Sequence, residues 1–390
     1  MGYSAYARQL PAADQEAYES VYSTLFGPSG QRSVCRIADL VEHLTSIGRV
    51  DNLRSLDKLD AVHASAVQEF VDWEDRKSDL RNLENVRLAG EAQYLLESVI
   101  VDTARIALDV TGETRLCLAG GSMMNTVAVE RILRETAASE VFVQPAANDA
   151  GTAIGAAYFG LHQLKAVART QTSYGSHSTY LGCAYQPTEV DSALRANSAV
   201  CATLPLAMED MVERAIADLA RGAIIAVSRG RSEFGPRALG NRSFLASPQH
   251  VDARDSVNRI KRRPWYQPVA PAVPVEALHT YFDAPFRSSP FMTVNAQSAE
   301  VTQRLAPAVV HADGSARVQS VDRNDNPFFH ELLVRFAAAT GLPPILINSS
   351  FNIDEPIVET PADALCTFAR CPIDVVGLVL EDRYVTRSPG

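Results

Sequence analysis

Residues 228–274 hold the densest group of side chains that could bind a charged ligand in this 390-residue chain. Between residues 229 and 263 there are nine basic residues and three acidic ones, whereas the whole chain has a net charge of −10. A cationic segment in an acidic protein favours a specific small anion, because the overall charge repels polyanions. Gly235 and Pro236 predict a tight turn that aims Arg237 at a phosphate or carboxylate. The alternative interpretation is a solvated basic face.

A double glycine, Gly120-Gly121, lies between an apolar stretch at 114–119 and a helical pattern at 123–134. Two glycines between a strand and a helix let the backbone approach a nucleotide, and the helix N-terminus offers free N–H groups. An ordinary tight turn is the alternative. Asn125, one turn into the predicted helix, would hold a ribose or base edge or be solvated.

A second strand-to-helix turn contains Asp149, between a predicted strand at 141–143 and a predicted helix at 152–164. A carboxylate at this position can cap the helix. Its oxygens would equally suit a metal ion that accompanies phosphates. None of the eight histidines has ligand spacing on one helix face, so both interpretations stay open.

The elements that must position these groups alternate between helical and strand patterns, which predicts an α/β protein. Residues 1–110 have helical patterns, the strongest at 85–108. The polar, aperiodic stretch at 166–178 predicts a linker between a domain at 1–165 and a domain at 179–390.

In the second predicted domain, a buried strand at 223–228 leads into the cationic segment, and a helix at 252–259 ends near Lys261. An alternating strand at 316–321 would place Arg317 and Gln319 on one face.

Two further signals lie near the C-terminus. Asn326 and Pro327 predict the start of a helix at 327–340. A strand at 344–347 runs into Asn348-Ser349-Ser350-Phe351-Asn352. Polar side chains after a buried strand lie where such sheets bind ligands, although a polar turn would have the same composition.

Composition excludes several classes of protein. No run of eighteen apolar residues is present, and the first twenty residues lack an apolar signal core, so we expect no membrane span and a cytoplasmic location. Six scattered cysteines without metal spacing predict reduced thiols. The pI of 5.4 disfavours a nucleic-acid partner.

Six segments, taken together, resemble the O-carbamoyltransferases of nodulation-factor and antibiotic biosynthesis in their order and spacing. These segments are LAGGSMMN (118–125), QPAANDAGTAIGAA (144–157), GRSEFGPRALGNRSFLASP (230–248), IKRRPWYQPVAPAV (260–273), DGSARVQSV (313–321) and NSSFNIDEPIVETPADAL (348–365).

The resemblance implies part of an actin-like (ribonuclease-H-like) domain followed by an α/β threonylcarbamoyl-adenylate-synthase-like domain. The second domain would condense carbamoyl phosphate with ATP to carbamoyl-adenylate. The first would transfer the carbamoyl group to a hydroxyl or amine of a small-molecule acceptor, beside a divalent metal (Fe or Mg).

The resemblance also implies roles for individual residues. Arg237, Lys261, Arg317 and Ser350 would be catalytic, around carbamoyl phosphate and the adenylate. Gly120, Gly121, Asn125, Arg231 and Asn352 would bind nucleotide, and Asp149 would be a metal ligand.

Two departures from the family shape the expected function. The family opens with a stretch carrying a histidine pair for the metal and an early phosphate loop, so we expect a separate polypeptide to supply that half. The family also has a glutamate and an arginine where this chain has Pro264 and Gln267. Losing that arginine removes a phosphate contact of about 2–3 kcal/mol, which allows a different acyl donor. Three hypotheses follow: a carbamoyltransferase subunit, an acyl-adenylate enzyme with another donor, and a non-catalytic partner of an intact relative.

Overall fold

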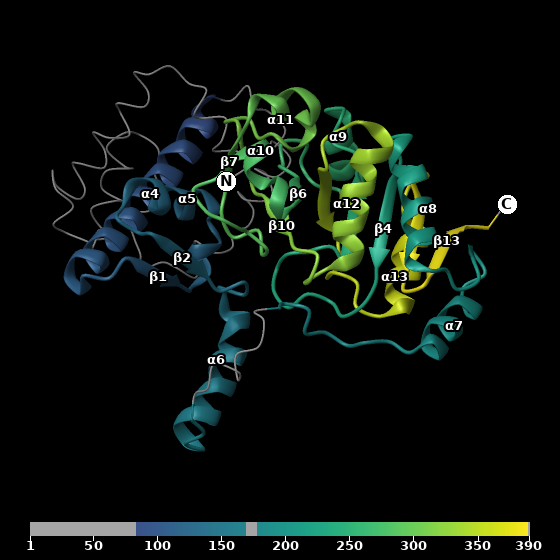
Figure 1. The fold of residues 1–390 in the computed structure, drawn as a ribbon, viewed down its shortest axis with the longest axis horizontal. Helices are drawn as coiled ribbons and strands as arrows, with labels where there is room; N and C mark the ends of the chain where they lie inside the picture. The colour runs from purple at the N-terminus through teal and green to yellow at the C-terminus, as the bar shows by residue number, and fades with distance from the viewer. Residues whose placement is uncertain (1–82, 169–177, 389–390) are drawn as a thin grey trace, which may run out of the picture. The chain divides into compact units, whose positions relative to one another are not determined.

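The computed structural model describes residues 83–168 and 178–388, and it confirms the α/β class (Figure 1). The chain divides into a unit that ends at Gly112 and a unit that begins at Glu113. The helices predicted before residue 83 and most of the predicted linker lie outside the described residues. The predicted domain boundaries therefore stay a prediction.

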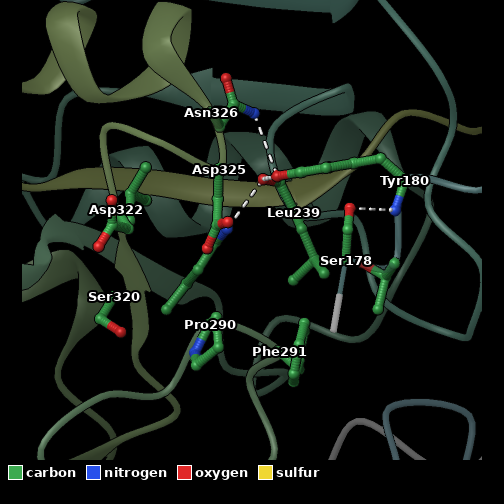
Figure 2. A pocket seen from close by; sticks show the side chains of 12 residues that line it. Ser178, Tyr180, Leu239, Pro290, Phe291, Ser320, Asp322, Asp325 and Asn326 are labelled. Atoms are coloured by element: carbon green, nitrogen blue, oxygen red, sulfur yellow. Dashed lines mark hydrogen bonds between the residues drawn. The ribbon is translucent and has the colours of Figure 1, made fainter. Parts of the chain in front are cut away.

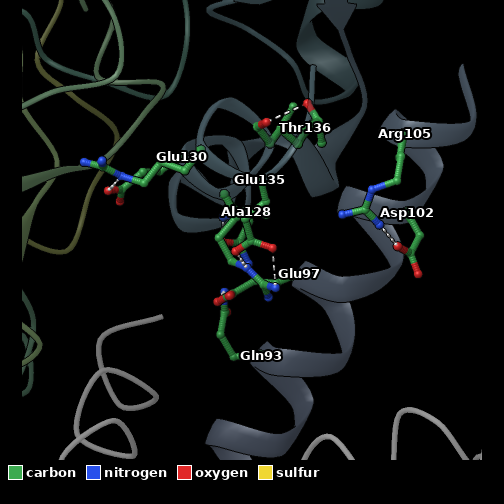
Figure 3. A network of polar contacts seen from close by, with 12 residues as sticks. Gln93, Glu97, Asp102, Arg105, Ala128, Glu130, Glu135 and Thr136 are labelled. Atoms are coloured by element: carbon green, nitrogen blue, oxygen red, sulfur yellow. Dashed lines mark hydrogen bonds and ion pairs between the residues drawn. The ribbon is translucent and has the colours of Figure 1, made fainter. Parts of the chain in front are cut away.

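The described part of the first unit is one long helix, α4 (Leu83–Thr111), which confirms the helix predicted at 85–108. Val101, Ala104 and Leu108 are buried at a spacing of three and four, as one face of an amphipathic helix requires. An ion pair one turn apart, with 2.5 Å between Arg105 Nη1 and Asp102 Oδ1, supports the polar face (Figure 3).

The second unit begins with a parallel pair of strands, β1 (Arg115–Leu118) and β2 (Glu140–Val143). Between them run the 3₁₀ turn η3 (Gly121–Met124) and the helix α5 (Thr126–Glu135). After β2 come η4 (Asp149–Gly151), α6 (Thr152–Phe159) and the π-helical turn η5 (Gly160–Leu164). The predicted strand–glycine–helix order is confirmed.

The core of the second unit is an eight-stranded mixed sheet in the order β10-β6-β11-β5-β4-β12-β13-β3. Its strands are β3 (Val200–Ala202), β4 (Ile224–Ser228), β5 (Arg242–Ala246), β6 (Ala270–Pro274), β10 (Gln319–Val321), β11 (Leu346–Ser350), β12 (Val375–Leu380) and β13 (Arg383–Arg387). A separate three-stranded sheet contains β7 (Phe282–Asp283), β8 (Ala296–Ser298) and β9 (Ser315–Ala316).

Helices cover both faces of the large sheet (Figure 1). One face packs against α8 (Met208–Ala220) and α12 (Pro327–Thr340). The other packs against α7 (Pro187–Arg195), α9 (Asp252–Ile260) and α13 (Pro361–Arg370). Successive residues of β4 pack into opposite cores: Ala226 lies on the side of α9 and α13, and Val227 on the side of α8 and α12. Burial on both faces explains why the sequence of β4 is an uninterrupted apolar run.

Shorter elements complete the second unit. They are η7 (Val275–Ala277), α10 (Leu278–Tyr281), α11 (Glu300–Leu305) and η8 (Pro307–Val309).

Strand directions bring four distant segments to one edge of the large sheet. Strands β4 and β11 both pair antiparallel with β5, so they run the same way and their carboxyl ends share an edge. Strand β6 runs antiparallel to β11 and parallel to β10, so the amino ends of β6 and β10 lie at that same edge. The segments that meet there follow β4 and β11 and precede β6 and β10.

The strand predicted at 316–321 is wrong as a single element. Arg317 and Val318 separate β9 from β10, because β9 pairs with β8 in the small sheet and β10 pairs with β6 in the large one. The strand predicted at 344–347 begins and ends later, as β11, so Ser350 is its last residue.

Candidate anion-binding site

Lys261 is the residue that follows α9. It lies at the shared sheet edge, and its side chain is buried. Its Nζ lies 2.8 Å from Ser350 Oγ and 2.5 Å from Asn352 Oδ1, and it also contacts the carbonyl oxygens of both residues. Ser350 Oγ in turn donates to Asn352 Oδ1 at 2.8 Å. The structure therefore brings together three residues that the sequence analysis singled out separately.

Burial and, to a lesser extent, the charge of Arg263 lower the pKa of Lys261 to about 7, while Cys371 opposes the shift. The oxygens around Nζ favour the ammonium form, so the lysine is held near the balance between its two protonation states. An anion beside it would favour the charged state.

The loop at 229–241, which joins β4 to β5, is held from inside by Glu233. Its Oε1 accepts the backbone N–H groups of Leu239 at 2.6 Å and Asn241 at 2.8 Å, with a longer contact of 3.4 Å from Arg242. Burial raises the pKa of Glu233, and these N–H groups oppose the shift. The carboxylate replaces the hydrogen bonds that a turn of this shape lacks.

Arg242 is fully buried and is a structural residue of the same loop. Its guanidinium donates to the carbonyls of Arg229, Gly230 and Asn241, and to Glu359 O at 3.3 Å from Nε and 3.2 Å from Nη2. Its donors are directed at backbone oxygens, so Arg242 shapes the cationic segment and does not face a ligand.

A second hydrogen-bond network, through Tyr180 and Asn326, contacts the loop at Leu239 (Figure 2). Tyr180 Oη donates to Leu239 O at 3.0 Å, and Asn326 Nδ2 donates to Tyr180 Oη at 3.1 Å. Asn326 also caps α12, with Oδ1 accepting Phe329 N–H at 3.0 Å, which confirms the predicted cap. Together with Glu233, these contacts make the loop rigid, as an aimed arginine requires.

Arg237, at the tip of this loop, is half-buried and makes no hydrogen bond or ion pair with the described residues. Burial alone lowers its pKa. The pKa of Arg317 lies well below its usual range, because the group is buried and because Arg237 and Arg263 are close enough for their charges to act on it. Arg317 Nε is buried without a hydrogen-bond partner.

Three basic residues near this edge have carboxylate partners. The exposed Arg259 and Arg262 pair with Asp374 and Asp354, and the half-buried Arg254 pairs with Asp255.

The inward group, Arg237, Lys261, Arg263 and Arg317, has no carboxylate partner among residues 83–168 and 178–388. Buried positive charges without a counter-ion are unfavourable, so this arrangement is suited to an anionic ligand.

A cavity of about 440 Å³ opens beside Ser350 and Asn352, the two residues that Lys261 contacts. Gly235 and Pro236 also line it, as do the acidic residues Glu233, Glu355 and Glu359. Its volume is in the range of sites that bind small molecules.

The glycine turn lies elsewhere in the second unit. Gly120 has a φ of 104°, in the left-handed region, and an added Cβ at Gly120 or Gly121 would meet no atom within 4 Å. The structure thus gives the two glycines open space, and their nucleotide role stays a prediction. A cavity of about 10 Å³ is lined by residues of both this region and the cationic loop, among them Met123 and Arg237.

The predicted position of Asn125 is wrong. It precedes α5 instead of lying one turn inside it, and Asn125 Oδ1 accepts Ala128 N–H at 3.3 Å as a helix cap. Asn125 lies outside α5 because η3 delays the start of the helix. The residue is 8% exposed. A nucleotide contact through this side chain stays a prediction.

Asp149 is exposed at the start of η4, and its backbone oxygen, not its carboxylate, accepts a hydrogen bond from Thr152 Oγ1. The predicted capping role of the carboxylate is therefore wrong. No group of three or more His, Cys, Asp or Glu side chains is placed to hold a metal in the part of the chain that the structure describes. These residues do not by themselves fit a metal centre, and the metal stays a prediction.

Arg231, predicted to bind nucleotide, is exposed and donates to Gly182 O at 2.8 Å. It lies on the same loop as Arg237 but outside the inward group. Its role stays a prediction.

Sequence reasoning missed Glu233, Arg263 and the structural character of Arg242. A signal existed for Glu233, since it is the single acidic residue between positions 229 and 251. No local pattern separates the outward arginines from the inward ones, because pairing with Asp354 and Asp374 depends on segments about a hundred residues away.

Among the helices of the described segments, none is long and apolar enough to cross a lipid bilayer.

Comparison with known proteins gave two family matches, carbamoyltransferase N-terminus at residues 47–158 and carbamoyltransferase C-terminus at residues 216–387. Nodulation protein NolO of Bradyrhizobium diazoefficiens is 37% identical over 308 residues, covering 77% of this chain and 55% of the relative. Nodulation protein NolNO of Sinorhizobium fredii is 38% identical, covering 77% and 44%. Nodulation protein U of Rhizobium tropici is 32% identical, covering 78% and 50%. The chain thus spans about half the length of these relatives.

Among solved structures, full-length HypF in the phosphate- and nucleotide-bound form aligns with a TM-score of 0.32 and 16% identity. The alignment covers 49% of this chain and 22% of HypF.

Proposed function

Because the chain belongs to the carbamoyltransferase family, we propose that its second unit makes carbamoyl-adenylate from carbamoyl phosphate and ATP for transfer to a small-molecule acceptor. The observation that carries the proposal is the set of four inward cations, of which Lys261 contacts Ser350 and Asn352 at the wall of the 440 Å³ cavity. Both substrates carry phosphate, and both leaving groups are anions.

The atoms balance if one water is consumed. Water releases phosphate from carbamoyl phosphate, an oxygen of the resulting carbamate attacks the α-phosphorus of ATP, and the bond to pyrophosphate breaks. Negative charge gathers at phosphorus and on the leaving pyrophosphate. Cations fixed in position stabilise such charge without covalent participation of the protein.

We assign roles from the geometry. The planar guanidinium groups of Arg237 and Arg317 suit phosphate oxygens, and Lys261 supplies a compact charge. Ser350 and Asn352 hold the Lys261 ammonium by accepting hydrogen bonds from it. The three cations thus act by electrostatic stabilisation, and the two polar residues act by positioning one of them.

The acceptor is proposed to be a hydroxyl or amine of a small-molecule natural product, and the β1–α5 region is proposed to belong to the transfer domain. A separate polypeptide that completes this domain is also proposed. Apolar side chains that stand exposed on α6 and η5 support it: Tyr158, Phe159, Leu161 and Leu164 are each at least 41% exposed.

The test is the release of pyrophosphate and phosphate from ATP and carbamoyl phosphate by the full chain. We expect both products in equal amounts, and loss of both in Arg237→Ala and Lys261→Ala. Arg259→Ala is the matched control, because Arg259 is exposed and paired with Asp374. Unchanged rates in the first two variants would refute the assignment of the site.

A second candidate donor follows from Pro264 and Gln267. Gln267 O accepts from Asn258 Nδ2 at 2.8 Å, so this residue is part of a folded loop without a cationic side chain. If pyrophosphate forms with another carboxylic acid and not with carbamoyl phosphate, the chain is an acyl-adenylate enzyme. If it forms under no condition, with or without an N-terminal half from NolO, the chain is a non-catalytic partner.

A further inference from the structure

Arg263 is an inward cation to which neither the sequence analysis nor the mechanism above assigns a role. It follows Arg262, whose φ of 51° lies in the left-handed region that residues with side chains rarely adopt. The Arg262 side chain is exposed and lies 3.2 Å from Asp354. The residues on either side, Lys261 and Arg263, are buried and half-buried. The strained turn thus separates one outward cation from two inward ones.

One donor of the Arg263 guanidinium is held by the protein. Its Nη2 donates to Asn258 Oδ1 at 2.9 Å, and Asn258 is fully buried. Asn258 Nδ2 donates to Trp265 O at 3.1 Å and to Gln267 O at 2.8 Å, so the same amide holds the loop that follows. A guanidinium oriented in this way is prepared for a ligand before the ligand arrives.

A neighbouring donor of the same guanidinium is not satisfied by the protein. Arg263 Nε is buried and has no hydrogen-bond partner. A buried donor without an acceptor is unfavourable, and a ligand oxygen that accepts from it would remove that cost. Arg317 Nε is in the same condition, which gives the site two buried guanidinium donors without acceptors.

Charge points the same way. Arg263 lies close enough to Lys261 and Arg317 to lower the pKa of each. Burial lowers the pKa of Arg263 itself, and no carboxylate in the described parts of the chain opposes that shift. The three cations therefore repel one another until an anion lies between them.

We propose that Arg263 is a further binding residue of this site, and that its Nε–H donates to a phosphate oxygen of the bound substrate. The inference rests on the proposed function, in which the substrates are ATP and carbamoyl phosphate. Arg263 also supplies a guanidinium to a loop that has Gln267 where the family has arginine.

The experiment compares the full-length wild type with Arg263→Gln, Arg263→Lys and the control Arg262→Gln. Binding of ATP, carbamoyl phosphate and inorganic phosphate is measured by calorimetry, and thermal unfolding is measured without ligand. We expect Arg263→Gln to lower the affinity for the phosphate ligand that Arg263 contacts by about 10- to 30-fold, as loss of a charge-assisted hydrogen bond does. We expect a smaller loss in Arg263→Lys and a change below about twofold in the control.

Unfolding separates binding from a merely structural role. Without ligand, Arg263→Gln should melt close to the wild-type temperature, because losing the hydrogen bond to Asn258 offsets the gain from removing a cation beside two others. A structural role predicts a lower melting temperature with unchanged affinity, and that result would overturn the inference. If Arg263→Gln does not fold, the affinities of Arg263→Lys decide in the same way.

The outcomes also separate this inference from the proposed function. If the wild type binds carbamoyl phosphate and ATP and Arg263→Gln binds both equally well, the inference fails and the function stands. If the wild type binds ATP or inorganic phosphate but not carbamoyl phosphate, and Arg263→Gln weakens that binding, the inference stands and the proposed donor fails. If the wild type binds none of the three, both fail.

Discussion

Proton uptake by Lys261 on ligand binding follows directly from the structure of the site. The ligand-free protein holds the pKa of this lysine at about 7, against 10.5 for an ordinary lysine. The difference corresponds to about 5 kcal/mol in favour of the neutral form. At pH 8 about nine in ten of these lysines are therefore neutral. A phosphate beside Nζ restores the charge, so binding should take up as much as about 0.9 proton.

The uptake is measured by calorimetric titration with the phosphate ligand at pH 8, in three buffers of different ionisation enthalpy. The slope of the observed enthalpy against buffer ionisation enthalpy gives the number of protons taken up. The neighbouring thiol does not confuse the result, since burial raises the pKa of Cys371 to about 12 and the group keeps its proton at pH 8. In Lys261→Met the slope should fall close to zero. A slope near zero in the wild type, or an equal slope in both proteins, would refute the reasoning.

The same lysine affects stability in the absence of ligand. Its pKa in the folded state lies below the unfolded value, so the unfolded state binds more protons between pH 7 and 10.5. Stability from this group therefore increases as the pH rises through that window. The difference in unfolding free energy between wild type and Lys261→Met, measured by denaturant titration, should change accordingly between pH 7 and 9.5. A constant difference would contradict the assigned pKa.

Three further predictions concern the loops. Glu233→Ala removes the acceptor of three backbone N–H groups and should cost about 3 kcal/mol of unfolding free energy, whereas Glu233→Gln should cost about 1. Gly240→Ala should cost about 2–4 kcal/mol, because its φ is 116° and the new Cβ would lie 2.4 Å from Phe329 Cδ1; Gly120→Ala, strained but open, should cost about 1. Denaturant unfolding measures the stability of all four variants. Equal losses for the two Glu233 variants would refute the argument about Glu233, and equal losses for the two glycine variants would refute the argument about Gly240. Arg231→Ala should raise the KM for ATP if this exposed arginine binds nucleotide, and an unchanged KM would remove it from the site.

Local signals in the sequence predicted the regular elements of the second unit well. The helix predicted at 327–340 begins and ends at those residues, as α12. Its predicted cap is also present, with Asn326 Oδ1 accepting Phe329 N–H at 3.0 Å. Such features depend on residues three or four apart, which the sequence displays directly.

Features that depend on distant partners could not be predicted in this way. The break at Arg317 exists because β9 and β10 join different sheets, and no pattern of period two records that change. Lys261, Ser350 and Asn352 were singled out separately, but their contact depends on strand order, since they are about ninety residues apart. Whether an arginine such as Arg242 is structural or faces a ligand also depends on which carbonyls surround it.

The most direct test of the central claim is a crystal structure grown with ATP and carbamoyl phosphate. The account predicts a phosphorus atom within about 4 Å of the Arg317 guanidinium and of Lys261 Nζ, beside the cavity lined by Ser350 and Asn352. Phosphate bound at another surface, with the inward cations still without an anion, would contradict it.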